Sequence, residues 1–486
     1  MDEIKRDYVF HRDLTKKYPM ITHGEGSYLI DEQGKKYLDG CSGAVAANLG
    51  HGIAQIAEAM AEQARKAAFV HTLRFETNVL HKLAEKIGKM APLHLNKVYF
   101  TSGGSEANES ALKLARQYHR DAGKMQKHIV IGRWQSYHGN TIGALSAGGD
   151  VKRRYPYTPN LLHFAHVYSP YCHRCPYNRN PEDCVANQNW SCITDIERTI
   201  LELGPENISA FIAEPIVGSQ QGAVVPPLDY FKKVRELCSR YDILLIVDEV
   251  MTGFGRTGTD FAVEQFGIEP DILTFGKGVS AGYAPLGGMI VHDRLIQGLL
   301  ENSSGKFLHG YTYSGHPVSI AAGLAALDMY EEMNILQNVE TQGAYLMECL
   351  VALQRKHPYI SDIRGRGLLI GLELMKDANQ QIFFEPREAA SEKLNEICME
   401  LGGVFYPGSG SIDGHKGEHI IISPPLNITK SEVDEIVRLL DHAFSIFYQH
   451  IRKDESYESA KQNRRASNQR KKTFITGDDK SNRACY

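Results

Sequence analysis

Two short apolar stretches of the sequence each end in a residue that could take part in catalysis. The first, Ile243–Val247, is followed directly by Asp248, and the second, Ile272–Phe275, is followed by Lys277 between two glycines. The first stretch is an unbroken apolar run, which is typical of a strand that is buried on both faces of a parallel sheet. Because ligands of open α/β sheets bind at the carboxyl ends of the strands, we expect the acid and the lysine to lie close together.

A carboxylate and a lysine in this arrangement could support pyridoxal phosphate chemistry. The lysine would form a Schiff base with the cofactor aldehyde, and the carboxylate would keep the pyridine nitrogen protonated so that the ring withdraws electrons. The pair alone does not decide the matter, because a metal-binding Asp248 and a surface Lys277 would give the same pattern. The residues at the ends of other predicted strands must decide between these interpretations.

Three further predicted strands end in residues that would suit a bound cofactor. A turn with Gly104 and Ser105 follows Val98–Thr101 and leads into a predicted helix, whose free N–H groups and dipole could hold a phosphate. Tyr137 could lie on a cofactor ring, and Glu214 ends another strand. A plain capped turn and a packed aromatic are the structural alternatives. Five such strand ends together favour one cofactor pocket.

The motifs around these residues resemble those of the class III (omega) aminotransferases, which are fold-type-I pyridoxal phosphate enzymes. The resemblance covers roughly residues 18–447, in the expected order and spacing. It rests on five stretches, namely Ser102–Asn108, Tyr137–Gly139, Glu214–Pro215, Asp248–Gly258 and Gly276–Gly278. The fold that it implies is α/β, with a large domain on a mostly parallel sheet of the seven-stranded type and a small α+β domain.

The resemblance also implies roles for individual residues. Lys277 would be the Schiff-base lysine and Asp248 the partner of the pyridine nitrogen, so these two are the predicted catalytic residues. Val250 would pack under the ring and Tyr137 over it. The full cofactor-binding set that the resemblance implies is Gly104, Ser105, Tyr137, His138, Glu214, Asp248, Val250, Lys277 and Thr312.

The remaining assigned roles concern contacts beyond the ring itself. By the resemblance, Thr312 would reach the phosphate bound by the neighbouring subunit, which implies a homodimer with two shared active sites. Gly104 and Ser105 would hold the phosphate of the cofactor bound to their own subunit. Glu214 would support the hydrogen-bond network that faces the cofactor ring. Arg256 is expected to tie the glycine loop structurally rather than to bind substrate.

The implied activity is transfer of an amino group between an amine or omega-amino acid and a keto acid such as pyruvate or 2-oxoglutarate, by a ping-pong Schiff-base mechanism. An isomerase, decarboxylase or lyase of the same family would keep Lys277 and Asp248, so this alternative stays open. A catalytically inactive binding protein is a third hypothesis. The intact lysine, acid, aromatic and phosphate turn argue against it.

Two departures from the family leave the substrate open. Many members carry an arginine for a substrate carboxylate near the Pro-Pro-Leu motif, but residues 404–411 and 421–426 contain none. Where amine–pyruvate members have a tryptophan, this chain has Val45. The pocket is therefore expected to be wider, with the acceptor carboxylate held by another group.

Composition sets the remaining bounds. The chain has 486 residues with a net charge of −4, which argues against nucleic acid or an anionic membrane as the main partner. The first residues are too charged for a signal peptide, and no apolar run reaches transmembrane length, so we expect a cytoplasmic protein. Its nine cysteines are expected to be reduced thiols or metal ligands.

Changes in pattern along the chain predict its domain organisation. Residues 1–60, with a predicted hairpin, are assigned to the small domain, 61–318 to the large cofactor-binding domain and 319–451 to the C-terminal small domain. Residues 452–486 form a polar, basic tail that is expected to be disordered. An insertion at about 168–194 holds Cys172, Cys175, Cys184 and Cys192, which could bind a structural zinc ion or remain as reduced thiols.

Overall fold

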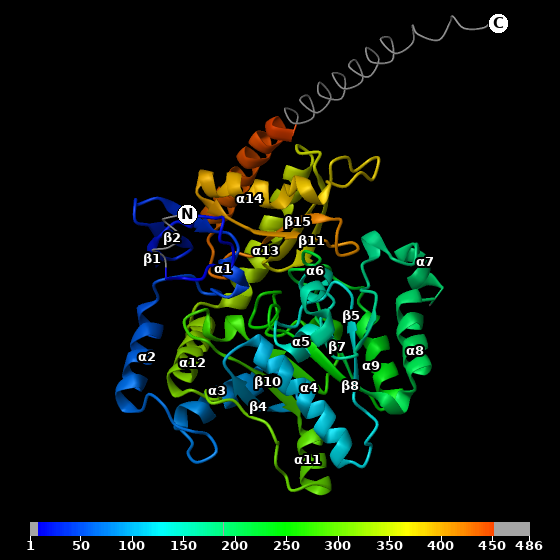
Figure 1. Ribbon diagram of the computed structural model, residues 1–486. Helices are drawn as coiled ribbons and strands as arrows, with labels where there is room; N and C mark the ends of the chain where they lie inside the picture. The colour runs from blue at the N-terminus through cyan, green and yellow to red at the C-terminus, as the bar shows by residue number, and fades with distance from the viewer. Residues whose placement is uncertain (1–7, 188, 452–486) are drawn as a thin grey trace, which may run out of the picture.

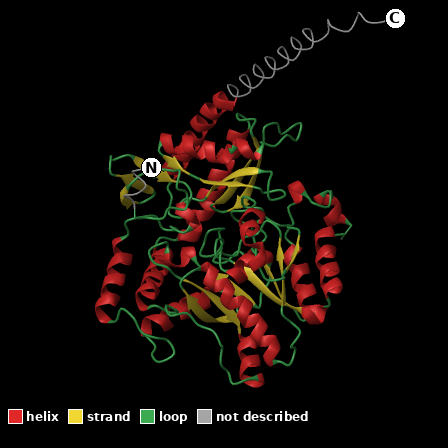
Figure 2. Cartoon of the chain, viewed as in Figure 1, coloured by secondary structure: helices red, strands yellow, loops and turns green. Residues whose placement is uncertain are grey.

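The computed structural model describes residues 8–187 and 189–451. The predicted disorder of the tail 452–486 falls outside this part of the chain. A large lower body holds one wide sheet, and a smaller upper body gathers most of the C-terminal elements (Figure 1). Figure 2 shows helices on both sides of the strands of the wide sheet.

The wide sheet has seven strands in the order β4-β10-β9-β8-β7-β5-β6. All neighbours are parallel except β10, which is antiparallel to both β4 and β9. The mostly parallel sheet that the sequence predicts is therefore confirmed. The strands are β4 (Leu95–Thr101), β5 (Ile129–Arg133), β6 (Ala165–Val167), β7 (Ile208–Ala213), β8 (Leu244–Asp248), β9 (Ile272–Phe275) and β10 (Gly287–His292).

Helices cover both faces of this sheet, as its apolar strands require. Leu245 and Val247 of β8 pack in a core with α3, α8, α9 and α12, whereas Leu244 and Ile246 pack in a second core with α4 and α11. The unbroken apolar run of β8 thus fills both faces. The helices are α3 (Asn78–Met90), α4 (Gly104–Asp121), α8 (Ser191–Leu203), α9 (Tyr230–Arg240), α11 (Asp293–Asn302) and α12 (Pro317–Glu332).

The smaller body combines the two ends of the described chain. Its antiparallel sheet has the order β11-β12-β15-β14, formed by β11 (Ile360–Arg366), β12 (Leu369–Leu374), β14 (Tyr406–Ser409) and β15 (Glu418–Ile422). It is covered by α13 (Ile335–Gln354), α14 (Ala390–Leu401) and a helix over residues 430–451. Leu38, Leu49 and Ile56 from the N-terminal region share a core with these elements.

The N-terminal strands pair with the C-terminal part of the chain. The order of their sheet is β1-β2-β3-β13, with β1 (Ile21–Glu25), β2 (Tyr28–Asp31), β3 (Lys36–Asp39) and β13 (Gly403–Val404). In Figure 1 the N-terminal strands lie beside α14 at the upper left. The predicted hairpin is present as β2 and β3, and α2 (Ala54–Lys66) follows it.

Short helical segments fill the connections between these elements. They are α1 (Ser42–Val45), α5 (Ile142–Ala147), α6 (Val151–Arg154), η2 (Tyr155–Asn160), η3 (Cys172–Arg174), α7 (Pro181–Ala186), η4 (Pro205–Asn207), α10 (Val263–Phe266), η5 (Lys277–Ser280) and η6 (Pro386–Glu388). In the described residues, no helix combines the length and the apolar character needed to cross a bilayer.

The structure differs from the sequence-based expectations in a few elements. The sequence pattern predicts a helix over residues 387–401, but the helix begins at Ala390, because Ala389 has a φ of 45° that interrupts the helical turn. The sequence pattern also predicts a strand over residues 367–374, but the strand begins at Leu369, since Gly367 has a φ of 55° and makes the turn between β11 and β12. The sequence patterns do not predict the strands β1, β6, β10, β11, β13 and β14.

Candidate active site

The carboxyl ends of five parallel strands surround one pocket with an empty volume of about 640 Å³. Its lining includes all five strand-end side chains that the sequence analysis selected, Ser105, Tyr137, Glu214, Asp248 and Lys277. Gly104, His138 and Val250 line it as well. Every predicted cofactor-binding residue except Thr312 therefore lies at this pocket.

Asp248 is the most firmly held carboxylate of the pocket. It is 4% exposed, and its Oδ2 accepts a hydrogen bond from Asn108 Nδ2 at 2.8 Å. His138 Nδ1 lies 2.8 Å from the same oxygen, and the backbone N–H of Val250 donates to Oδ1 at 3.0 Å. Because an ionised carboxylate only accepts, His138 must carry its proton on Nδ1.

Asn108 is a site residue to which the sequence analysis assigned no role. Besides Asp248, it donates to the backbone carbonyl of His138 at 2.7 Å, and its Oδ1 accepts from Thr274 Oγ1 at 2.8 Å. Asn108 is 1% exposed and belongs to α4, so it joins that helix to the ends of β8 and β9. The signal was present as a polar residue on a helix face that is otherwise rich in alanine and leucine.

Lys277 stands directly after β9, at the start of η5, in a strained backbone conformation. Its φ of 45° is in the left-handed region, which costs a non-glycine residue about 1 kcal/mol or more. The side chain is half-buried, and burial lowers the pKa of Lys277 to about 8, although the nearby carboxylates of Asp248 and Glu214 oppose this shift. A lysine amine with such a pKa is partly neutral near physiological pH, as a nucleophile or general base requires.

The N-terminus of α4 and the loop after β8 approach each other across the pocket. A Cβ atom placed on Gly104 would lie only 2.7 Å from Val250 Cγ1, so a glycine is needed there for this close packing. Ser105 Oγ accepts a hydrogen bond from the backbone N–H of Asn140 at 3.2 Å. The first N–H groups of α4 lack partners within the helix and favour an anion.

Glu214 positions the aromatic wall of the pocket. Its two carboxylate oxygens accept from the backbone N–H groups of Gly218, at 3.1 Å, and Tyr137, at 3.3 Å. Burial raises the pKa of Glu214, while the nearby His138 lowers it. The carboxylate therefore fixes the backbone at Tyr137, whose ring lines the pocket.

Two charged residues near Asp248 in the sequence, Glu249 and Arg256, do not line the pocket and instead hold backbone segments together. Glu249 is fully buried and accepts from the backbone N–H of Val263 at 2.8 Å. Arg256, also fully buried, donates to the carbonyls of Leu368 at 3.0 Å and Pro424 at 2.6 Å. Arg256 thus ties the glycine loop of the large body to the small one, as expected from the sequence.

Thr312 lies apart from this pocket within its own chain. Its side chain is exposed and is absent from the pocket lining. Thr312 is therefore the one predicted cofactor-binding residue that does not line the pocket of this chain.

The four cysteines of the insertion line a different cavity, between Tyr171, Tyr177 and Trp190. All four are free, and burial raises the pKa of Cys172 to about 11 and that of Cys192 to about 12. Their sulfur atoms do not form a compact ligand group in the described residues, so the structure gives no support to a zinc site here.

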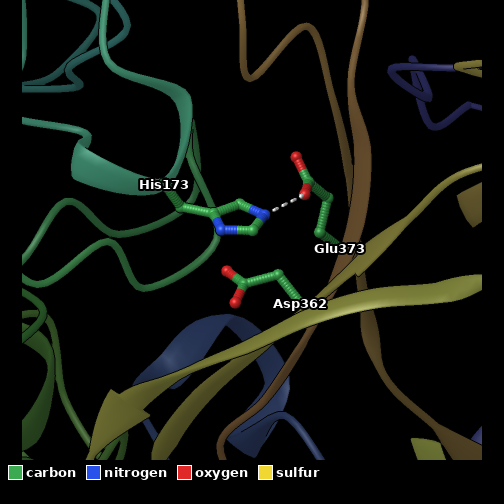
Figure 3. A group of neighbouring side chains, drawn as sticks. All are labelled: His173, Asp362 and Glu373. Carbon is green, nitrogen blue, oxygen red and sulfur yellow. Dashed lines mark ion pairs between the residues drawn. The ribbon is translucent and has the colours of Figure 1, made fainter. Parts of the chain in front are cut away.

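In the described part of the chain, one group of three possible metal ligands does lie close together, and Figure 3 shows it as His173, Asp362 and Glu373. Arginines already neutralise both carboxylates, because Arg174 Nη2 lies 3.0 Å from Glu373 and Arg364 Nη1 lies 2.7 Å from Asp362. The group therefore acts as an ionic contact between the cysteine insertion and the small sheet.

Comparisons with known proteins agree with this geometry. The family model "Aminotransferase class-III" matches residues 10–444. A putrescine–pyruvate aminotransferase of Pseudomonas aeruginosa is 37% identical, over 86% of this chain and 89% of its own length. A diaminobutyrate–2-oxoglutarate transaminase of Halomonas elongata is 35% identical, over 87% and 89% of the two chains.

A solved structure extends the likeness to the fold. The amine transaminase from an uncultivated Pseudomonas species, solved with pyridoxal phosphate bound, is 35% identical and superposes with a TM-score of 0.83 over 90% of this chain and 99% of its own. The fold-type-I architecture expected from the sequence is confirmed by this match. With a strand-end lysine, a buried acid and a family match over nearly its whole length, the chain belongs to the class III aminotransferases, which are pyridoxal-phosphate-dependent transaminases.

Proposed function

We propose that Lys277 and Asp248 are the catalytic pair of this transaminase and that the pocket around them holds pyridoxal phosphate. The observation that carries the proposal is the convergence of both residues, with His138 and Tyr137, on one pocket at adjacent strand ends. When bound, pyridoxal phosphate supplies an aldehyde that links to amines and a ring that withdraws electrons.

The residues of the pocket fit this cofactor. The buried carboxylate of Asp248 suits a protonated ring nitrogen, and the uncapped start of α4 suits a phosphate. Val250 packs against Gly104 and supplies an apolar side chain to the pocket, which the ring of Tyr137 also lines. His138 Nε2 is buried without a hydrogen-bond partner among the described residues, so the His138–Asp248 pair is oriented from one side only.

In this proposal each chain residue has a distinct task. The neutral amine of Lys277 takes the proton from the substrate Cα and later returns it. Asn108, His138 and the backbone N–H of Val250 all donate to the carboxylate of Asp248 and hold it in position. Glu214 keeps Tyr137 in place through the backbone N–H of that residue.

We further propose that the amino donor is an amine or omega-amino acid and that the acceptor is pyruvate or 2-oxoglutarate. Support comes from the two relatives named above, one acting with putrescine and pyruvate and the other with diaminobutyrate and 2-oxoglutarate.

A homodimer with shared active sites is part of the proposal. The loop of Thr312 lies beside a second loop, because the rings of Tyr313 and Phe69 are in contact at 6.1 Å. Both loops expose apolar side chains, among them Leu73 and Leu308. Apolar groups exposed together on neighbouring loops are typical of a surface that a partner covers.

We also propose that residues 61–318 form the cofactor-binding domain and that residues 1–60 and 319–451 form the small domain. The shared core of Leu38, Leu49 and Ile56 with the C-terminal elements supports placing the N-terminal segment there.

The test is a half-reaction on the reconstituted protein. We expect a panel of amines to convert the visible absorbance of the bound cofactor to that of the pyridoxamine form, with release of the matching carbonyl compound. Lys277→Ala should lose both the lysine-linked absorbance and turnover. An unchanged spectrum in this variant would remove Lys277 from the mechanism, and release of carbon dioxide without amine transfer would favour the decarboxylase alternative.

A further inference from the structure

A run of three basic residues on α6, Lys152 to Arg154, lies next to the pocket, and the structure gives each of them a different environment. Lys152 Nζ donates to Ser409 Oγ at 2.8 Å, away from the pocket. Arg154 Nη1 is held by backbone carbonyls, including that of Gly148 at 2.7 Å. Arg153 contacts a side chain that lines the pocket, because its guanidinium carbon lies 5.2 Å from the centre of the Tyr137 ring.

The guanidinium of Arg153 is anchored at one end only. Its Nε lies 2.8 Å from Asp150 Oδ2, and Asp150 also caps α6 by accepting from the backbone N–H of Arg153 at 3.2 Å. Asp150 is itself 8% exposed, which fixes the direction of the pair. The two terminal nitrogens of Arg153 make no hydrogen bond to any described residue. They present the planar fork that binds a carboxylate through two parallel hydrogen bonds.

A second arginine adds to the positive charge at the same ring. Burial raises the pKa of Tyr137, while the charges of Arg153 and Arg12 lower it. A positive charge beside a pocket favours an anionic ligand.

We propose that Arg153 binds the carboxylate of the keto-acid acceptor. The inference rests on the proposed function, since it needs the pocket of Lys277 to be the reaction site. Residues 404–411 and 421–426, where many family members have a carboxylate-binding arginine, contain none, and Arg153 would take over that role. A donor without a carboxylate is tolerated as well, because Asp150 keeps the charge of Arg153 compensated when no acid is bound.

The first experiment separates acceptors by charge. The pyridoxamine form of Arg153→Met is mixed with pyruvate, with 2-oxoglutarate and with an uncharged aldehyde such as butanal. We expect the KM for the keto acids to rise about 10- to 100-fold, the loss of a charge-assisted hydrogen-bond pair, while butanal reacts within about twofold of wild type. Arg153→Lys should recover part of the loss, since it restores the charge but not the fork.

Lys152→Met is the matched control, because it removes one positive charge from the adjacent residue without touching the fork. Its keto-acid KM should stay within about twofold of wild type. Equal losses in Lys152→Met and Arg153→Met would show a general field effect and overturn the proposal. Equal losses with keto acids and butanal in Arg153→Met would also overturn it.

A binding measurement keeps this inference separate from the proposed function. Propionate and glutarate carry carboxylates but no reacting carbonyl, so calorimetry can follow their binding whether or not the protein turns over. Weaker binding to Arg153→Met, but not to Lys152→Met, supports the carboxylate site. Unchanged binding overturns it even if amines and keto acids react normally, whereas failure of the amine half-reaction in wild type counts against the proposed function alone.

Discussion

At the scale of single residues, the chemistry of the site depends on a buried amine beside two carboxylates. Burial favours the neutral amine of Lys277, and the charges of Asp248 and Glu214 favour its protonated form. Burial is the larger effect here, and the pKa settles at about 8. A lysine on an exposed turn would be fully protonated at neutral pH and unable to act as a base.

The first prediction concerns Asp248→Asn. An amide cannot hold a pyridine nitrogen protonated, so the ring becomes a poorer electron sink and turnover should fall by about two orders of magnitude or more. The cofactor should stay bound, because the phosphate, Val250 and Lys277 contacts remain. Stopped-flow absorbance of the amine half-reaction measures the loss. Near-normal turnover would contradict the assignment of Asp248.

The second prediction follows from the lowered pKa of Lys277. Only the neutral amine bonds to the cofactor aldehyde, so the rate at which the apoprotein takes up pyridoxal phosphate should rise with pH and level off above about pH 8. In Asp248→Asn the midpoint should move to lower pH, because a carboxylate that raises the lysine pKa is gone. Absorbance at each pH gives the rate, with a free aliphatic amine as reference. A rate that still climbs steeply beyond pH 10 would show an unperturbed lysine.

At the scale of elements, the site depends on two backbone segments that almost touch. The start of α4 brings Gly104 against Val250, in the loop after β8. Neither element could hold a flat cofactor alone, because one supplies the free N–H groups and the other an apolar side chain. Their spacing is set by the absence of a side chain at residue 104.

The third prediction tests this spacing with Gly104→Ala. The added methyl group displaces Val250 towards the cofactor position, and overpacking of this kind costs about 1–3 kcal/mol, so the affinity for pyridoxal phosphate should fall about tenfold or more. Fluorescence titration of the apoprotein measures the dissociation constant.

Two further variants show whether crowding is the cause. A Cβ at Gly103 meets no atom within 4 Å, so Gly103→Ala should bind the cofactor like wild type. Adding Val250→Ala to Gly104→Ala makes room for the methyl group and should restore part of the affinity. If the double variant is as weak as the sum of its two single changes, the contact with Val250 is not what requires glycine.

At the scale of the whole molecule, the two bodies are joined by ties from distant parts of the chain. Arg256 reaches Pro424 and Asn48, so the glycine loop, the C-terminal sheet and the N-terminal region meet at one buried guanidinium. A second subunit would complete the pocket at the exposed loop of Thr312.

The fourth prediction tests that completion. A hydroxyl bonded to a phosphate dianion contributes about 1.5–3 kcal/mol, so Thr312→Ala should weaken cofactor binding about ten- to a hundredfold while fold and dimer stay intact. Equilibrium dialysis measures the affinity, and sedimentation checks the assembly.

Mixing variants shows whether the hydroxyl acts across the interface. In a mixed dimer of Lys277→Ala and Thr312→Ala subunits, one site would carry both lesions and the other neither. The intact site should bind the cofactor with wild-type affinity and turn over normally. If mixing yields no such site, Thr312 works within its own chain and the shared-site proposal fails.

The sequence by itself determined the elements that carry the chemistry. Apolar runs such as Ile243–Val247 encode burial on both faces locally, and the residue after such a run must lie at the sheet edge where ligands bind. For this reason the amino-acid pattern alone is enough to place Asp248, Lys277, Glu214 and Tyr137 at one pocket. The family motifs added the seven-stranded fold and the small domain.

Only the tertiary structure decided the contacts between residues that are far apart in the chain. The antiparallel strand β10, the pairing of β3 with β13 and the link from Asn108 to Asp248 depend on which elements pack together, and no local pattern specifies that. Lys152, Arg153 and Arg154 show the same limit most clearly. In the sequence they are three adjacent positive charges, and only the packing of α6 between a serine of the small sheet, backbone carbonyls and Tyr137 gives each a different environment.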